Sequence, residues 1–194
     1  MSRYIRSFLP WIAFAAISTD GDSRHGALAG FVLALWLLRS DRHRGRAWDG
    51  LVIEASSALF FGGLAFAAYA FDPSPFGDYG TAASVGWLAL TAWGSLAVRR
   101  PFTLGIARTM APAEVHGSAL FHRVNAVITA VWAAAFTVNA VALALLLAVA
   151  PHATAAIIAV KVCGFAVPAA FTARYPEIAR RRAGLKPAGP DAAA

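Results

Sequence analysis

One long uncharged segment, from Val124 to Ala150, limits most strongly what this chain can fold into. At about 1.5 Å per residue, a helix over this segment is about 40 Å long, which exceeds the ~30 Å hydrocarbon core of a bilayer. A helix of a soluble protein needs a polar face, and this segment almost entirely lacks one. We therefore predict a transmembrane helix here, and with it an integral membrane protein.

The composition agrees with this class. Of the 194 residues, 59% are hydrophobic and only 14% are charged, whereas soluble domains contain about 25% charged residues. The pattern of apolar segments predicts an all-α fold, a polytopic membrane helix bundle with six transmembrane helices. The predicted spans cover residues 4–18, 26–38, 51–71, 79–98, 124–150 and 154–172. The first two are at or below the usual limit of ~17 residues, so they either borrow flanking polar residues or form a re-entrant hairpin.

Two further regions complete the predicted organisation. Residues 1–175 are expected to form the transmembrane domain, and residues 176–194 a basic cytoplasmic tail that is disordered beyond Arg182. Residues 99–123 contain prolines and glycines that interrupt a regular span. We predict that they lie on the membrane surface as an interfacial segment between the fourth and fifth helices. Its arginines are expected to contact lipid headgroups: Arg99, Arg100, Arg108 and Arg123.

The distribution of charge predicts the orientation. With six spans, the side that holds both termini also holds 15 of the 17 Lys and Arg residues. The opposite side holds Arg24 together with four acidic residues, Asp20, Asp22, Asp72 and Asp78. Because basic loops face the cytoplasm, we predict a multi-pass protein of the bacterial inner membrane with both termini cytoplasmic. Its basic loops are expected to contact anionic lipid, and no nucleic acid partner is expected.

The polar residues of the fifth predicted span share one face. They follow helical spacing and comprise Asn125, Thr129, Trp132, Phe136 and Asn139. Side-chain amides in a membrane need hydrogen-bond partners, so this polar stripe is predicted to face the interior of the bundle.

Lys161 lies well inside the last predicted span, and cations at such positions are functional candidates. An antiparallel hairpin of the last two helices places Lys161 about one turn from Asn139, which predicts a contact between them. The alternative is that Lys161 extends to the outer interface, toward Asp72 or Asp78. Gly164 and Pro168 follow in the same helix and form either a hinge or an ordinary proline-containing turn. Near the cytoplasmic end of the third span, Glu54 is expected to face Arg46 or the neighbouring arginines.

No sequence motif indicates catalysis. The five histidines lack metal-ligand spacing, the single Cys163 lies in an apolar segment, and phosphate- and nucleotide-binding motifs are absent from the sequence. We therefore predict no catalytic residue, no cofactor and no metal site.

Several short motifs occur in an order that resembles the intracellular septation protein A family of small bacterial inner-membrane proteins. They begin with Phe8-Leu9-Pro10 and the junction Arg99-Arg100-Pro101-Phe102, continue with the Asn125…Trp132…Phe136…Asn139 helix, and end with Val160–Phe165 and Tyr175-Pro176. The resemblance implies a role in cell-envelope maintenance and division through contacts with other membrane proteins. It implies no catalytic residue. The chain departs from the family in its longer fourth loop and its Arg- and Ala-rich composition, so partner contacts there do not carry over.

These observations favour a non-enzymatic envelope protein that acts through lipids, other membrane proteins or a second copy of itself. Two alternatives stay open. A small transporter or channel would use the polar stripe, Lys161 and the Gly164–Pro168 break as a path. A membrane-embedded enzyme would hold a lipid headgroup at the 99–123 segment.

Overall fold

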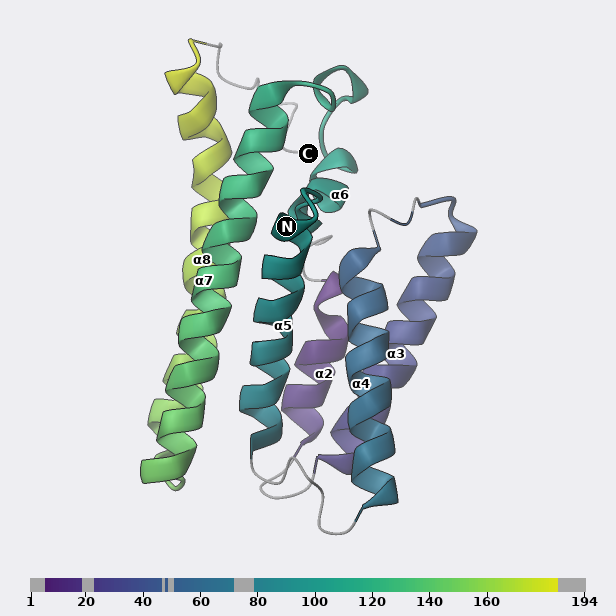
Figure 1. Cartoon of the computed structure of the whole chain (residues 1–194), viewed down its shortest axis with the longest axis vertical. Coiled ribbons are helices and arrows are strands. Elements are labelled where there is room, and N and C mark those ends of the chain that lie inside the picture. The colour runs from purple at the N-terminus through teal and green to yellow at the C-terminus, as the bar shows by residue number, and fades with distance from the viewer. Residues whose placement is uncertain (1–5, 19–22, 47, 49–50, 72–78, 185–194) are drawn as a thin grey trace.

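The computed structural model describes residues 6–18, 23–46, 48, 51–71 and 79–184. Within these residues the regular structure is entirely helical, which confirms the predicted all-α class. The elements are α2 (Leu9–Ile17), α3 (Arg24–His43), α4 (Val52–Ala70), α5 (Gly80–Ala97), α6 (Phe102–Arg108), η3 (Ala113–Val115), α7 (Ala119–Val149) and α8 (Thr154–Arg182). The long helices stand side by side and alternate in direction (Figure 1). The acidic residues predicted for the opposite face, Asp20, Asp22, Asp72 and Asp78, lie outside the described residues.

Fewer helices than predicted are suited to cross a membrane. Among the described residues, α4, α7 and α8 are long and apolar enough, and α5 with α6 adds a fourth if this pair, bent by 80°, counts as one span. A multi-span helical membrane protein is thus supported, but six spans are not. The helix α2 has 9 residues, about 14 Å of helix. The helix α3 has 20 residues, but its first and last turns carry the charges of Arg24, Arg39 and Asp41.

The bounds of the last two helices differ from the prediction. The helix α7 begins five residues before Val124, because the Ser118 hydroxyl accepts a hydrogen bond from the Phe121 N–H at 3.2 Å and so caps the first turn. The helix α8 continues past Pro176 to Arg182. Residues 176–182 of the predicted tail are therefore helical, and the Arg181 Nε lies 3.0 Å from the Glu177 carboxylate. Residues 185–194 of the predicted tail lie outside the described residues.

The 99–123 segment contains a short buried helix. Its first part forms α6, which is bent by 80° from α5, packs against α7 and buries Phe102, Thr103, Leu104 and Ile106. The physical reason for this burial is that the short helix is apolar on nearly every side and fits beside the polar face of α7. The following part, around Met110 and Val115, is exposed. The placement of this segment at the membrane surface stays a prediction.

Small residues let α3 approach its neighbours closely. Gly26 and Gly30 are both buried on one face of this helix. A Cβ atom added at Gly30 would lie 2.9 Å from the ring of Phe61 on α4, and one at Gly26 would overlap Ser18 at the end of α2. Glycine is therefore required at both positions for the helices to pack at this distance.

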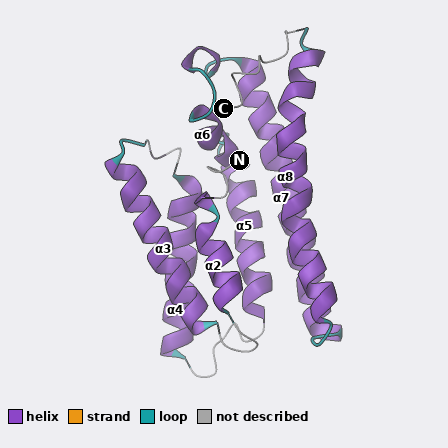
Figure 2. Cartoon of the chain, turned by 180° about the vertical axis from the view of Figure 1, so that it is seen from behind, coloured by secondary structure: helices purple, strands orange, loops and turns teal. Residues whose placement is uncertain are grey.

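The helix α2 lies in the middle of the bundle, between α4 and α5 in both views (Figures 1 and 2). Trp11 stacks on Phe60 of α4 with ring centroids 5.3 Å apart, and its indole N–H donates to the Ser57 hydroxyl at 2.7 Å. Just before α2, Phe8 stacks on Trp132 of α7 at 5.5 Å and meets Phe165 of α8 edge to face at 5.9 Å. This short helix therefore joins α4 on one side to α7 and α8 on the other.

Candidate functional site

The chain bends by 80° where α5 ends and α6 begins. The Arg99 N–H donates to the carbonyl of Leu96 at 2.9 Å, and the Arg100 N–H donates to the carbonyl of Ser95 at 2.8 Å. This pair of bonds is a Schellman motif, in which the residue after the C-cap takes a left-handed conformation. Pro101 follows and prevents the helix from continuing.

Arg99 occupies that left-handed position with φ of +57°. Glycine is preferred there because a Cβ atom crowds the following carbonyl, which costs about 1–2 kcal/mol for other L-residues. Among the described residues, Arg99 is the only non-glycine residue with positive φ. Strained backbone conformations are concentrated at functional sites, so the side chain of Arg99 is a candidate functional group.

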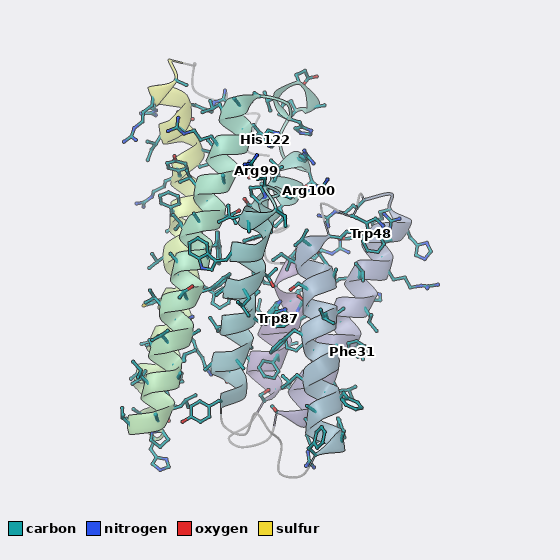
Figure 3. The ribbon with its side chains drawn as sticks, in the orientation of Figure 1. Phe31, Trp48, Trp87, Arg99, Arg100 and His122 are labelled. Atoms are coloured by element: carbon teal, nitrogen blue, oxygen red, sulfur yellow. The ribbon has the colours of Figure 1, made fainter. Side chains whose placement is uncertain are left out.

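Arg99 lines a cavity of about 550 Å³, which we call the arginine pocket. Figure 3 shows Arg99, Arg100 and His122 close together at the end of α5. The pocket is lined by Trp48, Arg99, Arg100, Pro101, Leu104, Gly105, Arg108 and His122. Three of these lining residues are arginines: Arg99, Arg100 and Arg108.

The wall of the arginine pocket is anchored on its buried side. The Ser95 hydroxyl accepts a hydrogen bond from the Phe102 N–H at 3.2 Å, which ties the start of α6 to α5. The Thr103 hydroxyl donates to the Asn125 carbonyl at 3.0 Å and lies 2.8 Å from the Thr129 hydroxyl. Because a hydroxyl has one proton, Thr129 is the donor in the second bond. The helix α6, which contributes to the pocket wall, is therefore held to α7 by these hydrogen bonds.

The structure places all five residues of the polar stripe in the protein interior, each no more than 5% exposed. Thr129 bonds to α6, and the Asn125 amide donates to the Phe121 carbonyl of its own helix at 2.9 Å. The Trp132 indole N–H donates to the Thr172 hydroxyl of α8 at 2.9 Å. Phe136 packs against Phe165 with ring centroids 5.4 Å apart.

Asn139, the last residue of the stripe, differs from the others. Neither its amide nitrogen nor its amide oxygen has a hydrogen-bond partner among the described residues, although the residue is only 3% exposed. Its side chain lies against Gly164 of α8, where a Cβ atom would overlap it. The predicted contact between Lys161 and Asn139 is therefore not a hydrogen bond of the amide. Lys161 itself is half-buried on α8.

The predicted hinge residues, Gly164 and Pro168, lie within α8, which is one continuous helix through both. Pro168 lacks an N–H, so the Gly164 carbonyl loses the backbone donor of a regular helix. One turn later, the Thr172 hydroxyl donates to the Pro168 carbonyl at 2.8 Å while it accepts from Trp132. This part of α8 is therefore held to α7 by side chains.

Sequence reasoning missed a buried charge cluster at the same end of the bundle. Asp41, at the end of α3, is 2% exposed and forms ion pairs with Arg6 at 3.0 Å and with Arg44 at 3.4 Å, and another with Arg46. Arg46 also lies 3.6 Å from Glu54, which confirms the predicted pairing of Glu54. The Ser7 hydroxyl donates to the Glu54 carboxylate at 2.7 Å. The sequence feature that could have indicated this cluster is Asp41, the acid within the otherwise strongly basic segment Arg39–Arg46.

The remaining candidates are separate from the arginine pocket. Arg123 is exposed on the first turn of α7 and is not among the lining residues. Cys163 is exposed on α8. In the part of the chain that the structure describes, no group of three His, Cys, Asp or Glu residues is placed to hold a metal ion.

No protein-family model, curated protein or solved structure matches this chain. The likeness to the septation family therefore stays a prediction from short motifs.

Proposed function

We propose that this chain is a non-enzymatic membrane protein with a closed helical core, and that it serves cell-envelope maintenance and septation through lipid and membrane-protein contacts. The observation that carries the proposal is the packing of the polar stripe. A scaffold keeps its intramembrane polar groups packed among its own helices, as Asn139 is against Gly164 although its amide has no hydrogen-bond partner among the described residues. Thr129, Asn125 and Trp132 each have a hydrogen-bond partner within the bundle.

A transporter path along α7 and α8 is the competing function. Such a path requires water to reach Asn125, Thr129 and Asn139 during the transport cycle. All three are at most 3% exposed, and aromatic rings of Phe8, Trp132, Phe136 and Phe165 stack beside them. The burial favours the scaffold, because opening this region to water would separate four packed rings.

Accessibility to a thiol reagent tests the choice. Single cysteines at Asn125, Thr129 and Asn139, in a Cys163→Ala background, are treated with a membrane-impermeant maleimide in native membrane vesicles. A cysteine at Ser118, which is exposed at the start of α7, is the positive control. We expect Ser118→Cys to react from one side and the three stripe positions to stay unlabelled. Labelling of the stripe would establish a hydrated path and replace the scaffold with a transporter.

The cellular role needs its own experiment. Deletion of the gene in its host is expected to lengthen cells or to delay septum closure, and expression of the chain is expected to restore normal division. A Trp132→Ala variant, which loses the Thr172 hydrogen bond and the stacked Phe8 ring, is expected to complement poorly. Normal cell length and envelope integrity after deletion would refute the septation role and leave the closed core unaffected.

A further inference from the structure

We infer that α8 has a second, bent conformation, in which the side-chain amide of Asn139 donates a hydrogen bond to the backbone carbonyl of Gly164. Gly164 and Pro168 then act as a hinge, and Asn139 on α7 holds this hinge in its bent state. The inference goes beyond the closed core of the proposed function and does not rest on the septation role. It starts from two polar groups that lie at one contact between the helices.

The first group is the Asn139 amide. Its nitrogen and its oxygen are both buried without a hydrogen-bond partner among the described residues, and the residue is 3% exposed. A buried amide without a partner raises the free energy of the conformation that contains it. Inside a membrane, no bulk water replaces the missing partner. A conformation in which this amide gains a partner is therefore favoured by the energy of the new hydrogen bond.

The second group is the Gly164 carbonyl. In a regular helix it accepts a hydrogen bond from the N–H four residues later, but that residue is Pro168, which has no N–H. Side chains and neighbouring helices bond such freed carbonyls in membrane helices. Asn139 is the neighbouring side chain here, because a Cβ atom added at Gly164 would overlap its amide nitrogen. A donor without an acceptor and an acceptor without its helical donor therefore lie at the same contact.

Pro168 determines where α8 bends. Proline is a frequent cause of helix kinks, because its ring crowds the carbonyl four residues earlier and removes a hydrogen bond between successive turns. On the C-terminal side of Pro168, the Trp132 indole donates to the Thr172 hydroxyl and holds α8 to α7. The N-terminal half begins at Thr154 and contains no buried residue, since the buried residues of α8 are Pro168 and Ala179. The N-terminal half is therefore the part that moves.

The two conformations differ by opposing contributions of similar size. Bending forms the amide–carbonyl hydrogen bond, but it also separates the half-buried side chains of Ile157 and Val160 from the core. Single interhelical hydrogen bonds and single apolar contacts are both weak in a membrane protein. We therefore expect both conformations to be populated, the bent one in roughly a tenth of the molecules. Ile158 and Val162 are exposed on the moving half, so the bend changes the apolar surface that α8 presents to the membrane.

Double electron–electron resonance on the full-length protein in lipid nanodiscs tests the inference. Frozen samples retain both conformations, so the measurement counts them whatever their rate of exchange. Spin labels are attached in a Cys163→Ala background, with Leu59→Cys on α4 as the common reference. Ile158→Cys reports on the N-terminal half of α8 and Ala173→Cys on the C-terminal half, and all three labelled sites are exposed. We expect two distances for the Ile158 pair, the second in roughly a tenth of the molecules, and one distance for the Ala173 pair.

Variants assign the second distance to the hinge. Asn139→Leu keeps the approximate shape of the side chain and removes the amide, and Pro168→Ala returns the N–H that the Gly164 carbonyl lacks. Each is expected to lower the population of the second distance by about fivefold, the effect of one hydrogen bond. Asn125→Leu is the matched control, because the Asn125 amide already donates to the Phe121 carbonyl of its own helix. It is expected to leave the ratio of the two distances unchanged. Circular dichroism checks that each variant is folded.

Four results would overturn the inference. A single distance for the Ile158 pair would mean that α8 does not bend. A second distance that persists in either Asn139→Leu or Pro168→Ala would mean that another interaction holds the bend. An equal loss in Asn125→Leu would indicate a general effect on packing, and an equal second distance for the Ala173 pair would mean that α8 moves as a whole. None of these results depends on the thiol labelling of the polar stripe, so failure of the hinge and failure of the scaffold are distinguishable.

Discussion

Arg99 shows how a single residue can work against the stability of the chain that contains it. Its φ of +57° satisfies the Schellman turn, but only glycine adopts this conformation without strain. The positive φ of Arg99 could not be predicted from the sequence. The residues Arg99-Arg100-Pro101 are typical of a basic loop, and the backbone angle depends on how α5 ends.

We predict that Arg99→Gly raises the free energy of unfolding by about 0.5–1 kcal/mol, because the relief of left-handed strain exceeds the added flexibility of the unfolded chain. The measurement is thermal unfolding in detergent. Arg100→Gly is the matched control. Arg100 does not have positive φ, so glycine there is expected to lower stability by about 0.5–1 kcal/mol. The same sign of change in both variants would contradict the strain argument.

Asp41 is the second residue whose contribution to stability is evident only from the structure. One carboxylate, 2% exposed, faces Arg6, Arg44 and Arg46 from two parts of the chain. The sequence indicated a basic loop, and it is the burial of the acid that converts the loop into a compact ion cluster.

We predict that Asp41→Asn lowers the free energy of unfolding by about 1–3 kcal/mol, because it removes the charge of the buried carboxylate that pairs with Arg6, Arg44 and Arg46. Glu177→Gln removes the exposed Arg181 pair on α8 and is expected to cost no more than about 0.5 kcal/mol. Denaturant unfolding of both variants measures the difference. Similar losses would show that Asp41 is solvated in the membrane-bound protein.

At the scale of elements, the contact between α7 and α8 depends on an interlocked pair. The Asn139 side chain occupies the space that a Cβ atom at Gly164 would need. Neither helix can change at this point without the other, so the two residues act as one packing unit.

We predict that Gly164→Ala destabilises the protein by about 1–3 kcal/mol through overpacking. Asn139→Ala should restore most of that loss, because it empties the space the new methyl group requires. Gly63→Ala on α4, where a Cβ would meet nothing within 4 Å, is the control and is expected to be close to neutral. Additive losses in the double variant would contradict the interlocked packing.

Predictability from sequence differed between elements for a physical reason. The uncharged run and the Asn125–Asn139 spacing indicated α7 and its buried face, because helical periodicity survives in a long segment. The short helix α6 has no such period, and its burial depends on the polar face of α7 that it covers. The last span was predicted to end at residue 172, but α8 continues through Pro176 to Arg182.

At the scale of the whole molecule, the six segments predicted as spans are helical and alternate in direction (Figure 1), but only three or four helices among the described residues are suited to cross a membrane. Their lengths were harder to predict, because a helix surrounded by others need not span the membrane. The helix α2 is the example. Its short length was expected from the sequence, but its central position follows from contacts of Phe8 and Trp11 with helices distant in the chain.

We predict that Phe8→Ala lowers the free energy of unfolding by about 3–5 kcal/mol, because Phe8 is 6% exposed and contacts rings of both α7 and α8. The adjacent Leu9 is 37% exposed, and Leu9→Ala is expected to cost less than about 1 kcal/mol. Thermal unfolding of the two variants tests the pair. Equal losses of stability would mean that the contacts of Phe8 do not connect α2 to α7 and α8.

The shortness of α2 also has a consequence for biogenesis. Chains are synthesised from the N-terminus, and early segments usually fold first. A helix of 9 residues is too short to be retained alone as a transmembrane segment by the insertion machinery. The rings that hold Phe8, those of Trp132 and Phe165, emerge near the other end of the chain. The helix α2 therefore leaves the ribosome long before α7 and α8, the helices whose rings hold Phe8, have been made.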